Sequence, residues 1–152
     1  MRENMGLFRG KQLNNGEWVV GYYVRLYDSK GNVSHRIYHG DAETDCGDFY
    51  PDWYEVDPKT VGECTGLKEK DKNGKLIFEG DIVKATVSYN NMLRDKVDHS
   101  TEIYEVKYHM PHCYFYLARE RNNLLFDGNW NYFLKDIEVI GNIHDNKELF
   151  ES

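Results

Sequence analysis

The segment from Val61 to Ala85, VGECTGLKEKDKNGKLIFEGDIVKA, constrains the fold most, because it places two turn signals directly before a strand-like run. Asn73-Gly74 between apolar residues is a strong hairpin signal, since both residues tolerate a positive φ. In Glu79-Gly80-Asp81, glycine supplies backbone freedom and the aspartate can accept hydrogen bonds from nearby N–H groups, which predicts a second turn. The β-branched run over residues 82–87 then predicts a strand.

Strand-like runs separated by turn residues continue along the whole chain. Residues 17–26 and 33–39 predict a β-hairpin, and its first strand places one set of apolar side chains on a single face: Trp18, Val20, Tyr22, Val24 and Leu26. Further strands are expected over residues 52–56, 61–64, 101–109, 113–119, 124–126 and 136–143, and residues 88–100 form either a long loop or a hairpin tip. We therefore expect an all-β fold, a single-domain sandwich or partly open barrel of short antiparallel strands, with at most one or two short helical turns.

Three segments carry a family resemblance, in the same order along the chain. The stretch TGLKEKDKNGKLIFEGDIVKA resembles the signature of the YopX-like family of phage and prophage proteins. LFRGKQLNNGEWVVGYYV is similar to the opening of that family, and EVIGNIHDNKELF is similar to its closing segment. The sequence departs from the family pattern in a longer central turn, in Cys64 and in Lys147. The resemblance implies one YopX-like domain over residues 1–152 and a phage or prophage origin, and it carries no catalytic residues over.

Composition limits the compartment and the partners. The net charge of −7 disfavours binding to duplex DNA, which needs clustered Lys and Arg, but it permits a local basic patch. The cysteines Cys46, Cys64 and Cys113 are odd in number and dispersed, which is typical of a reducing cytosol. Because the N-terminus has no apolar leader and the chain has no apolar run of membrane length, we expect no membrane partner and a location in the cytoplasm of the bacterial host cell.

Three clusters raise the question of a metal ion. His109, His112 and Cys113 lie within five positions, as zinc accepts, but no second cluster supplies a fourth ligand, so a strand connection with a partly buried cysteine is the competing interpretation. The acidic stretch of Asp41, Glu43, Asp45 and Asp48 could hold magnesium or serve acid–base chemistry, or form a solvated loop. Around Asp71 the sequence looks like half an EF-hand, yet Gly80 stands where the bidentate Glu is required. We expect no cofactor and retain His109, His112 and Cys113 as candidate metal ligands.

The sequence has no nucleophile elbow, phosphate-binding loop or dinucleotide fingerprint, so an enzyme is disfavoured. Our main hypothesis is a non-enzymatic binding module that self-assembles into a homo-oligomer or docks on a host protein through exposed sheet edges and aromatic faces. The alternative is a single-stranded nucleic-acid binder, in which tyrosines stack on bases beside basic residues, unless these rings are core packing. The side chains concerned are Tyr22, Tyr23, Tyr104, Tyr108, Tyr114, Tyr116, Lys84, Lys107, Arg119 and Arg121. A metal-dependent enzyme is a third option.

Seven turn residues are predicted to serve backbone geometry and not reactivity. They are Gly66, Asn73, Gly74, Gly80, Asp81, Gly141 and Asn142.

Overall fold

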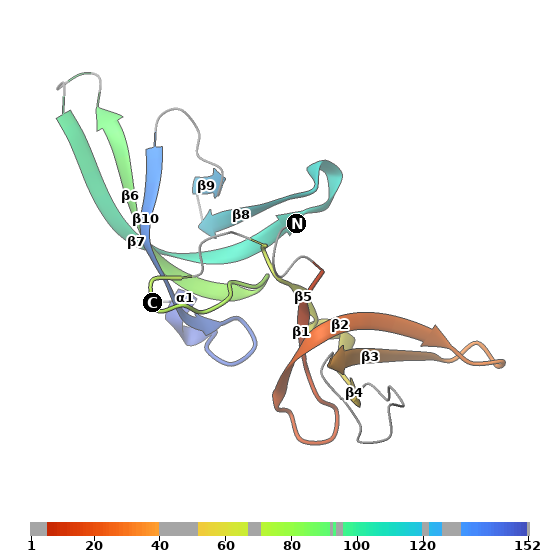
Figure 1. Ribbon diagram of the computed structural model, residues 1–152. Helices are drawn as coiled ribbons and strands as arrows, with labels where there is room; N and C mark the ends of the chain where they lie inside the picture. Colours follow the sequence, from red (N-terminus) through yellow and green to blue (C-terminus); the bar gives the residue numbers. More distant parts are fainter. Residues whose placement is uncertain are drawn as a thin grey trace. The chain divides into compact units, whose positions relative to one another are not determined.

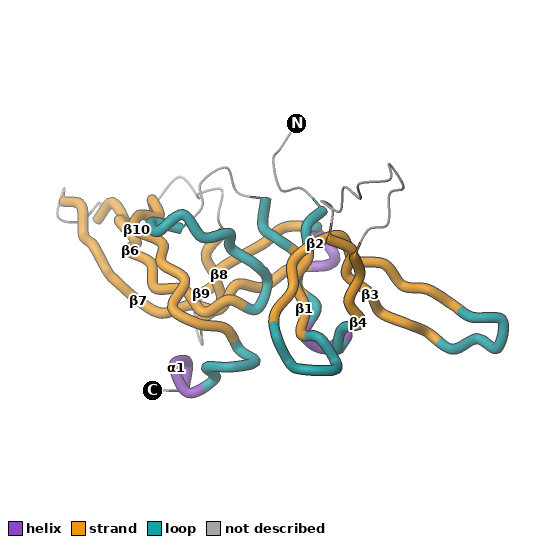
Figure 2. The backbone as a smooth tube through the Cα atoms, turned by 60° about the horizontal axis from the view of Figure 1, so that its bottom comes forward, coloured by secondary structure: helices purple, strands orange, loops and turns teal. Residues whose placement is uncertain are grey.

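The computed structural model describes residues 6–39, 52–66, 71–91, 93, 96–119, 122–125 and 132–151. The chain divides into two compact units, Met1–Gly66 and Leu67–Ser152. Strands make up nearly all of the regular structure in both units (Figure 1; Figure 2). Among the described residues, no helix has the length and apolar character needed to cross a membrane. This division does not test whether residues 1–152 form the single domain expected from the sequence, so the single domain stays a prediction.

The N-terminal unit is a five-stranded antiparallel sheet with the strand order β4-β3-β2-β1-β5. The strands are β1 (Phe8–Lys11), β2 (Trp18–Tyr27), β3 (Val33–His39), β4 (Asp52–Glu55) and β5 (Gly62–Glu63), and the 3₁₀ helix η1 (Pro58–Thr60) precedes β5. The predicted hairpin is confirmed as β2 and β3, whose register pairs Tyr22 with Tyr38.

This sheet curls until the chain after β1 reaches the chain after β4. Gln12 forms a bridge with Val56, and the N–H of Leu13 donates to the carbonyl of Glu55 at 3.0 Å. The side of the sheet that faces this core, the inner face, carries Ile37 and Val56, both fully buried. A Cβ on Gly21 would lie 2.2 Å from the carbonyl oxygen of Tyr38, so the curl requires glycine there. The other side of the sheet is called the outer face below.

The C-terminal unit is a second antiparallel sheet, with the order β10-β6-β7-β8-β9. Its strands are β6 (Asp81–Asn91), β7 (Lys96–His109), β8 (Tyr114–Arg119), β9 (Asn122–Leu125) and β10 (Tyr132–Asn142). The 3₁₀ helix η2 (Met110–His112) joins β7 to β8, and the helix α1 (Glu148–Glu151) follows β10. Residues 88–91 and 96–100 belong to the paired strands β6 and β7, so these described residues fit the second predicted alternative, a hairpin. The largest cluster of buried side chains that the structure describes here comprises Ile77, Val83, Ala85, Val87, Tyr104, Val106 and Leu117.

The central turn differs from the predicted hairpin. Gly74 has a φ of 81°, but Asn73 does not share the left-handed region, since the described non-glycine residues with positive φ are Cys113 and Asp136. The N–H of Gly74 donates to the carbonyl of Asp71 at 2.9 Å, and Leu76 is not in a strand. The physical reason lies in the Asp71 side chain, which accepts the N–H groups of Asn73 and Lys75 and so replaces a facing strand.

The all-β prediction is confirmed. The helices among the described residues are two 3₁₀ turns of three residues and the four-residue α1. Neither of the two sheets is closed into a barrel.

Candidate binding face of the N-terminal sheet

The outer face of the N-terminal sheet combines aromatic and basic side chains from four strands. From β2 it receives the apolar set predicted from the sequence, Trp18, Val20, Tyr22, Val24 and Leu26. The register adds Arg9 and Lys11 from β1, Ser34, Arg36 and Tyr38 from β3, and Trp53 and Glu55 from β4. Opposite residues of antiparallel strands point to the same side, so these side chains share one surface.

Three aromatic side chains form a row across this face. Tyr22 pairs with Tyr38, and Tyr38 pairs with Trp53. Tyr22 is 55% exposed and Trp53 is 46% exposed, which is unusual for such large apolar side chains. Because neighbouring strands lie about 4.8 Å apart, the row spans about 10 Å. We call Tyr22, Tyr38 and Trp53 the aromatic row.

Cationic groups lie over the two tryptophan rings of the outer face. The Cζ atom of Arg36 is 3.9 Å from the ring centroid of Trp53. The Nε of Arg36 donates to the Oγ of Ser34 at 3.0 Å, which fixes the orientation of the guanidinium group. Over Trp18, the Cζ atom of Arg9 lies at 4.8 Å and the Nζ atom of Lys11 at 5.4 Å. These cation–π contacts hold positive charge beside the exposed ring of Trp53 and the half-buried ring of Trp18.

The charge of this face differs from that of the chain as a whole. Of the basic residues in strands β1–β5, Arg9, Lys11 and Arg36 lie on the outer face and Arg25 on the inner face. Of the acidic residues in these strands, Glu55 lies on the outer face, whereas Asp52 and Glu63 lie on the inner face. A chain with a net charge of −7 therefore presents a face on which basic groups outnumber acidic ones.

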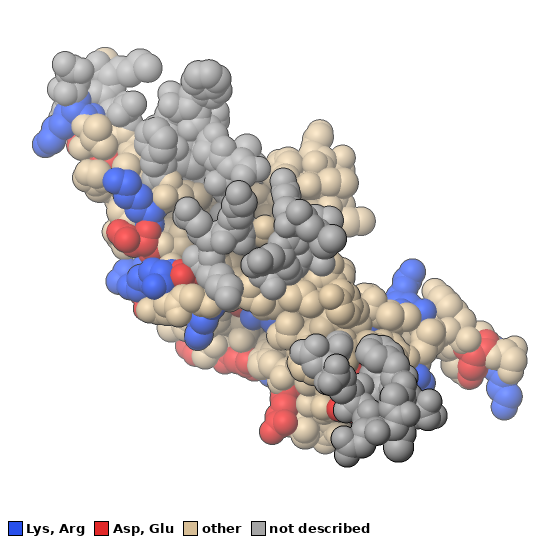
Figure 3. All heavy atoms as spheres, viewed as in Figure 1, with Lys and Arg blue, Asp and Glu red and all other residues tan. Residues whose placement is uncertain are grey.

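The described residues of the C-terminal unit carry basic and acidic side chains side by side on the face seen in Figure 3. Lys72 forms an ion pair with Glu138 at 2.6 Å, and Arg119 forms one with Glu102. Such paired charges leave little net positive potential for an anionic ligand.

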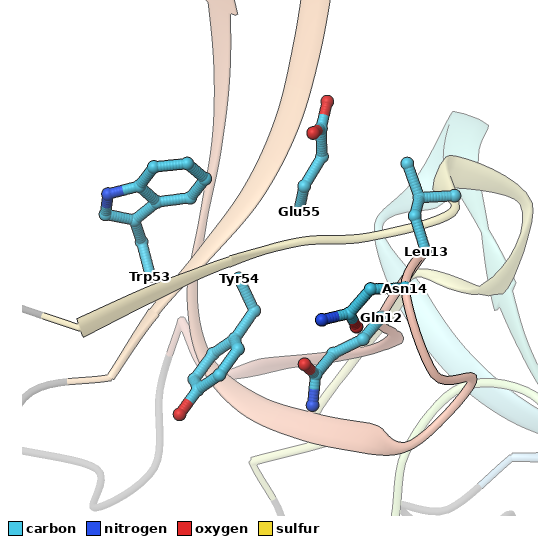
Figure 4. Close-up of a pocket in the computed structure, with 6 residues that line it drawn as sticks. All are labelled: Gln12, Leu13, Asn14, Trp53, Tyr54 and Glu55. Carbon is cyan, nitrogen blue, oxygen red and sulfur yellow. The ribbon is translucent and has the colours of Figure 1, made fainter.

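A shallow pocket of about 260 Å³ adjoins the aromatic row at Trp53. Its lining residues are Gln12, Leu13, Asn14, Trp53, Tyr54 and Glu55. Along β4, Trp53 and Glu55 point to one side and Tyr54 to the other, as Figure 4 shows. The lining combines aromatic rings with the amide side chains of Gln12 and Asn14, so the pocket offers hydrogen-bonding groups beside apolar surface.

The tyrosines predicted to stack on bases do not form one surface. Tyr104 is 4% exposed and belongs to the core, so core packing and not base stacking holds for this residue. Tyr108 packs on Phe115, with ring centroids 4.9 Å apart. Tyr23 lies on the inner side, where its hydroxyl bonds the Nδ1 atom of His35 at 2.6 Å and where burial raises the pKa of the phenol.

The basic partners proposed for these tyrosines are dispersed as well. Lys84 is exposed on β6, and Lys107 forms an ion pair with Glu105 at 3.3 Å. Arg119 is paired with Glu102. Arg121 lies outside the described residues. Of the predicted set, Tyr22 alone belongs to the aromatic row, and the period-2 alternation of β2 indicated the face on which it lies.

The candidate metal ligands lie at the turn between β7 and β8. The Nδ1 atoms of His109 and His112 are 3.2 Å apart. Cys113 is exposed and not partly buried as the competing interpretation supposed, and its Sγ donates to the carbonyl of Met110 at 3.6 Å. Within the described ranges no three His, Cys, Asp or Glu side chains gather as a metal-binding group. The acidic stretch of Asp41, Glu43, Asp45 and Asp48 lies outside the described residues.

The predicted turn residues lie where the backbone has a positive φ, a side-chain hydrogen bond to the backbone or no room for a Cβ. Gly66 and Gly80 have φ values of 63° and 83°. The Oδ2 atom of Asp81 accepts the N–H of Phe78 at 2.8 Å, and a Cβ on Gly141 would lie 2.7 Å from the Oδ1 atom of Asn146. Asn142 caps the following turn, because its Oδ1 atom accepts the N–H groups of His144 and Asp145, two and three residues later, at 3.0 Å each. These contacts support a conformational role.

No sequence motif predicted the polar contact between Ser88 and His99. The Oγ atom of Ser88 and the Nδ1 atom of His99 are 2.8 Å apart across the β6–β7 hairpin. The pair arises from strand register, which no local motif records. Ser88 is 3% exposed, so its hydroxyl does not reach a substrate in this geometry.

Comparison with known proteins identifies the chain at the level of a family. No curated protein and no solved structure matches it. The sequence model described as YopX protein matches residues 7–151, nearly the whole chain and both compact units. The chain therefore belongs to the YopX protein family.

Proposed function

We propose that this protein is a non-enzymatic binding module that binds single-stranded nucleic acid on the outer face of its N-terminal sheet. The observation that carries the proposal is the aromatic row, with the guanidinium group of Arg36 held 3.9 Å from the Trp53 ring centroid. Proteins that bind single strands combine stacking rings with a positively charged surface. A sheet whose exposed aromatics stack two or three bases is a common form of such a site.

The chemistry favours a single strand over a duplex. A side-chain ring can stack on a base only where that base is not already stacked between its neighbours in a helix. Arg9, Lys11 and Arg36 supply few positive charges, too few to anchor a duplex through its phosphates alone. Stacking therefore has to contribute most of the affinity, and the basic residues orient the backbone beside the rings.

We also propose an origin for the gene and a cellular location for the protein. A phage or prophage gene and the cytoplasm of a bacterial host form the setting that membership of the YopX protein family supports. A site of replication or transcription in such a cell exposes single strands.

Fluorescence anisotropy with a labelled single-stranded oligonucleotide of about 12 nucleotides tests the proposal. Trp53→Ala and Tyr22→Ala should each weaken binding roughly 5- to 150-fold, which corresponds to the loss of one stacked base. The matched control is Tyr27→Ala, because Tyr27 is 64% exposed on the same strand but points to the inner side. The affinity of this variant should equal that of the wild type.

Three outcomes of the binding titrations would overturn the proposal. They are an absence of saturable binding at low salt, equal losses in Tyr22→Ala and Tyr27→Ala, and tighter binding of a duplex of the same sequence. If light scattering instead shows that Trp53→Ala dissociates a homo-oligomer, and the affinity of this variant for the oligonucleotide is unchanged, the aromatic row is a protein interface and the nucleic-acid proposal fails.

A further inference from the structure

The rings of His109, His112, Tyr114 and Tyr116 cluster at the turn between β7 and β8, in the C-terminal unit. The rings of His109 and His112 have centroids 4.9 Å apart and planes 20° apart. The rings of His109 and Tyr114 also have centroids 4.9 Å apart, and their planes differ by 7°. Within this cluster the two imidazoles present their Nδ1 atoms to each other at 3.2 Å.

That separation matches the distance between two nitrogen ligands of one metal ion. Zn–N bonds of about 2.0–2.1 Å place two nitrogens about 3.4 Å apart at a tetrahedral angle and about 2.9 Å apart at a right angle. The observed 3.2 Å lies between these values. In the metal-free pair, one imidazole donates an Nδ1 proton to the bare Nδ1 of the other, and a metal ion would displace that proton.

We propose that His109 and His112 form a two-nitrogen site for a divalent transition-metal ion. The proposal is independent of the nucleic-acid function, because it concerns the other compact unit. Zinc, nickel and copper are the ions of this class that bind imidazole well.

The turn holds both ligands in position before any ion arrives. Stacking on Tyr114 restrains the His109 ring, and η2 places His112 three residues later on the same side. Cys113 ends the turn in the left-handed region with a φ of 53°, so the backbone there has a defined conformation. Preorganised ligands lose less conformational entropy on binding than flexible ones.

The remaining coordination positions are open. No third His, Cys, Asp or Glu joins the pair to make a metal-binding group within the part of the chain that the structure describes. The Cys113 thiol is directed to the carbonyl of Met110, so it is outside the ligand set. Water or an external donor therefore completes the shell, as at metal sites that keep an exchangeable position.

Isothermal titration of the full-length, tag-free protein with zinc chloride and then nickel chloride tests the site. We expect one ion per chain and at least a tenfold weaker affinity in His109→Asn and in His112→Asn. His39→Asn is the control, since His39 lies in the N-terminal unit, where its Nδ1 contacts the carbonyl of Val20 at 3.0 Å. Cys113→Ser should bind as the wild type does.

A second measurement needs no variant and so does not depend on their folding. In ¹⁵N-resolved spectra of the wild type, zinc should shift the Nδ1 resonances of both His109 and His112. The proposal is overturned by an absence of saturable binding, by undiminished affinity in His112→Asn, by loss of affinity in Cys113→Ser, or by zinc-induced shifts confined to other histidines.

Discussion

The Oδ2 atom of Asp71 accepts a hydrogen bond of 2.9 Å from the backbone N–H of Val139, 68 residues further along the chain. Its Oδ1 atom accepts the N–H groups of Asn73 and Lys75 at 2.9 and 2.8 Å. One carboxylate therefore joins the central turn to β10, between the two register shifts of that strand. The segment that most resembles the family signature is thus an integral part of the C-terminal sheet.

Asp71→Asn should lower the free energy of unfolding by about 2–3 kcal/mol. The amide cannot accept three N–H groups as a carboxylate does, and a donor left without a partner near the core is costly. Urea unfolding followed by circular dichroism measures the change. Asp28→Asn is the control: Asp28 accepts the N–H groups of Lys30 and Asn32 in a similar way but lies at an exposed turn, so its effect should be smaller. Equal effects of the two variants would contradict this account.

The contribution of Asp71 to stability should depend on pH. Burial opposes ionisation of this carboxyl, but hydrogen bonds from the N–H groups of Val139, Lys75 and Asn73 outweigh that effect and hold its pKa below the usual value. A lowered pKa in the folded state means that the contribution is complete above the unfolded pKa of about 3.9 and is lost as pH falls through the folded pKa. The stability difference between wild type and Asp71→Asn should therefore be constant near neutrality and shrink below about pH 4. Unfolding free energies measured from pH 7 downwards check the prediction, which a pH-independent difference would refute.

Gly74→Val should cost more than about 1 kcal/mol in stability, because a β-branched residue is strained at a φ of 81°. A Cβ at this position meets no atom within 4 Å, so the cost arises from the backbone and not from a clash. Gly74→Asn should therefore keep most of the stability that Gly74→Val loses, since asparagine tolerates the left-handed region. Thermal unfolding of both variants measures the effect, and an unchanged midpoint for Gly74→Val would exclude the positive φ.

Arg36→Gln should reduce the salt dependence of oligonucleotide binding. If Arg36 neutralises one phosphate, its loss lowers the slope of log K against log salt by about 0.7. Arg25→Gln is the matched control, because Arg25 lies on the neighbouring strand but on the inner face. Anisotropy titrations at several salt concentrations give the slopes. A reduction of the slope in both variants would indicate a general charge effect and not a contact at the outer face.

Local patterns predicted the strands because their causes are local. The alternation in residues 17–26 identified both the β2–β3 hairpin and the face that holds Trp18 and Tyr22. The same residues could not indicate that Tyr38 and Trp53 complete the aromatic row, because that depends on the register among three strands. Arg9 and Arg36 join the face for the same reason.

The form of the central turn could not be predicted from local patterns. Asn73-Gly74 correctly predicted a positive φ at the glycine but not the form of the turn, because the outcome depends on Asp71. Val139, which anchors that carboxylate, lies far away in the sequence. Likewise, the spacing of His109 and His112 identified a pair of ligands, whereas the contact between their Nδ1 atoms follows from the turn conformation set by η2 and Cys113.

The pairing of β1 has a consequence for biosynthesis. Phe8 is aligned with Glu63, and the N–H of Cys64 donates to the carbonyl of Leu7 at 2.8 Å. The first strand described in this unit thus pairs with residues near the end of the unit, which gives the unit a high contact order. On the ribosome, the β2–β3 hairpin can form early, but the N-terminal unit cannot complete its folding until Cys64 has left the exit tunnel.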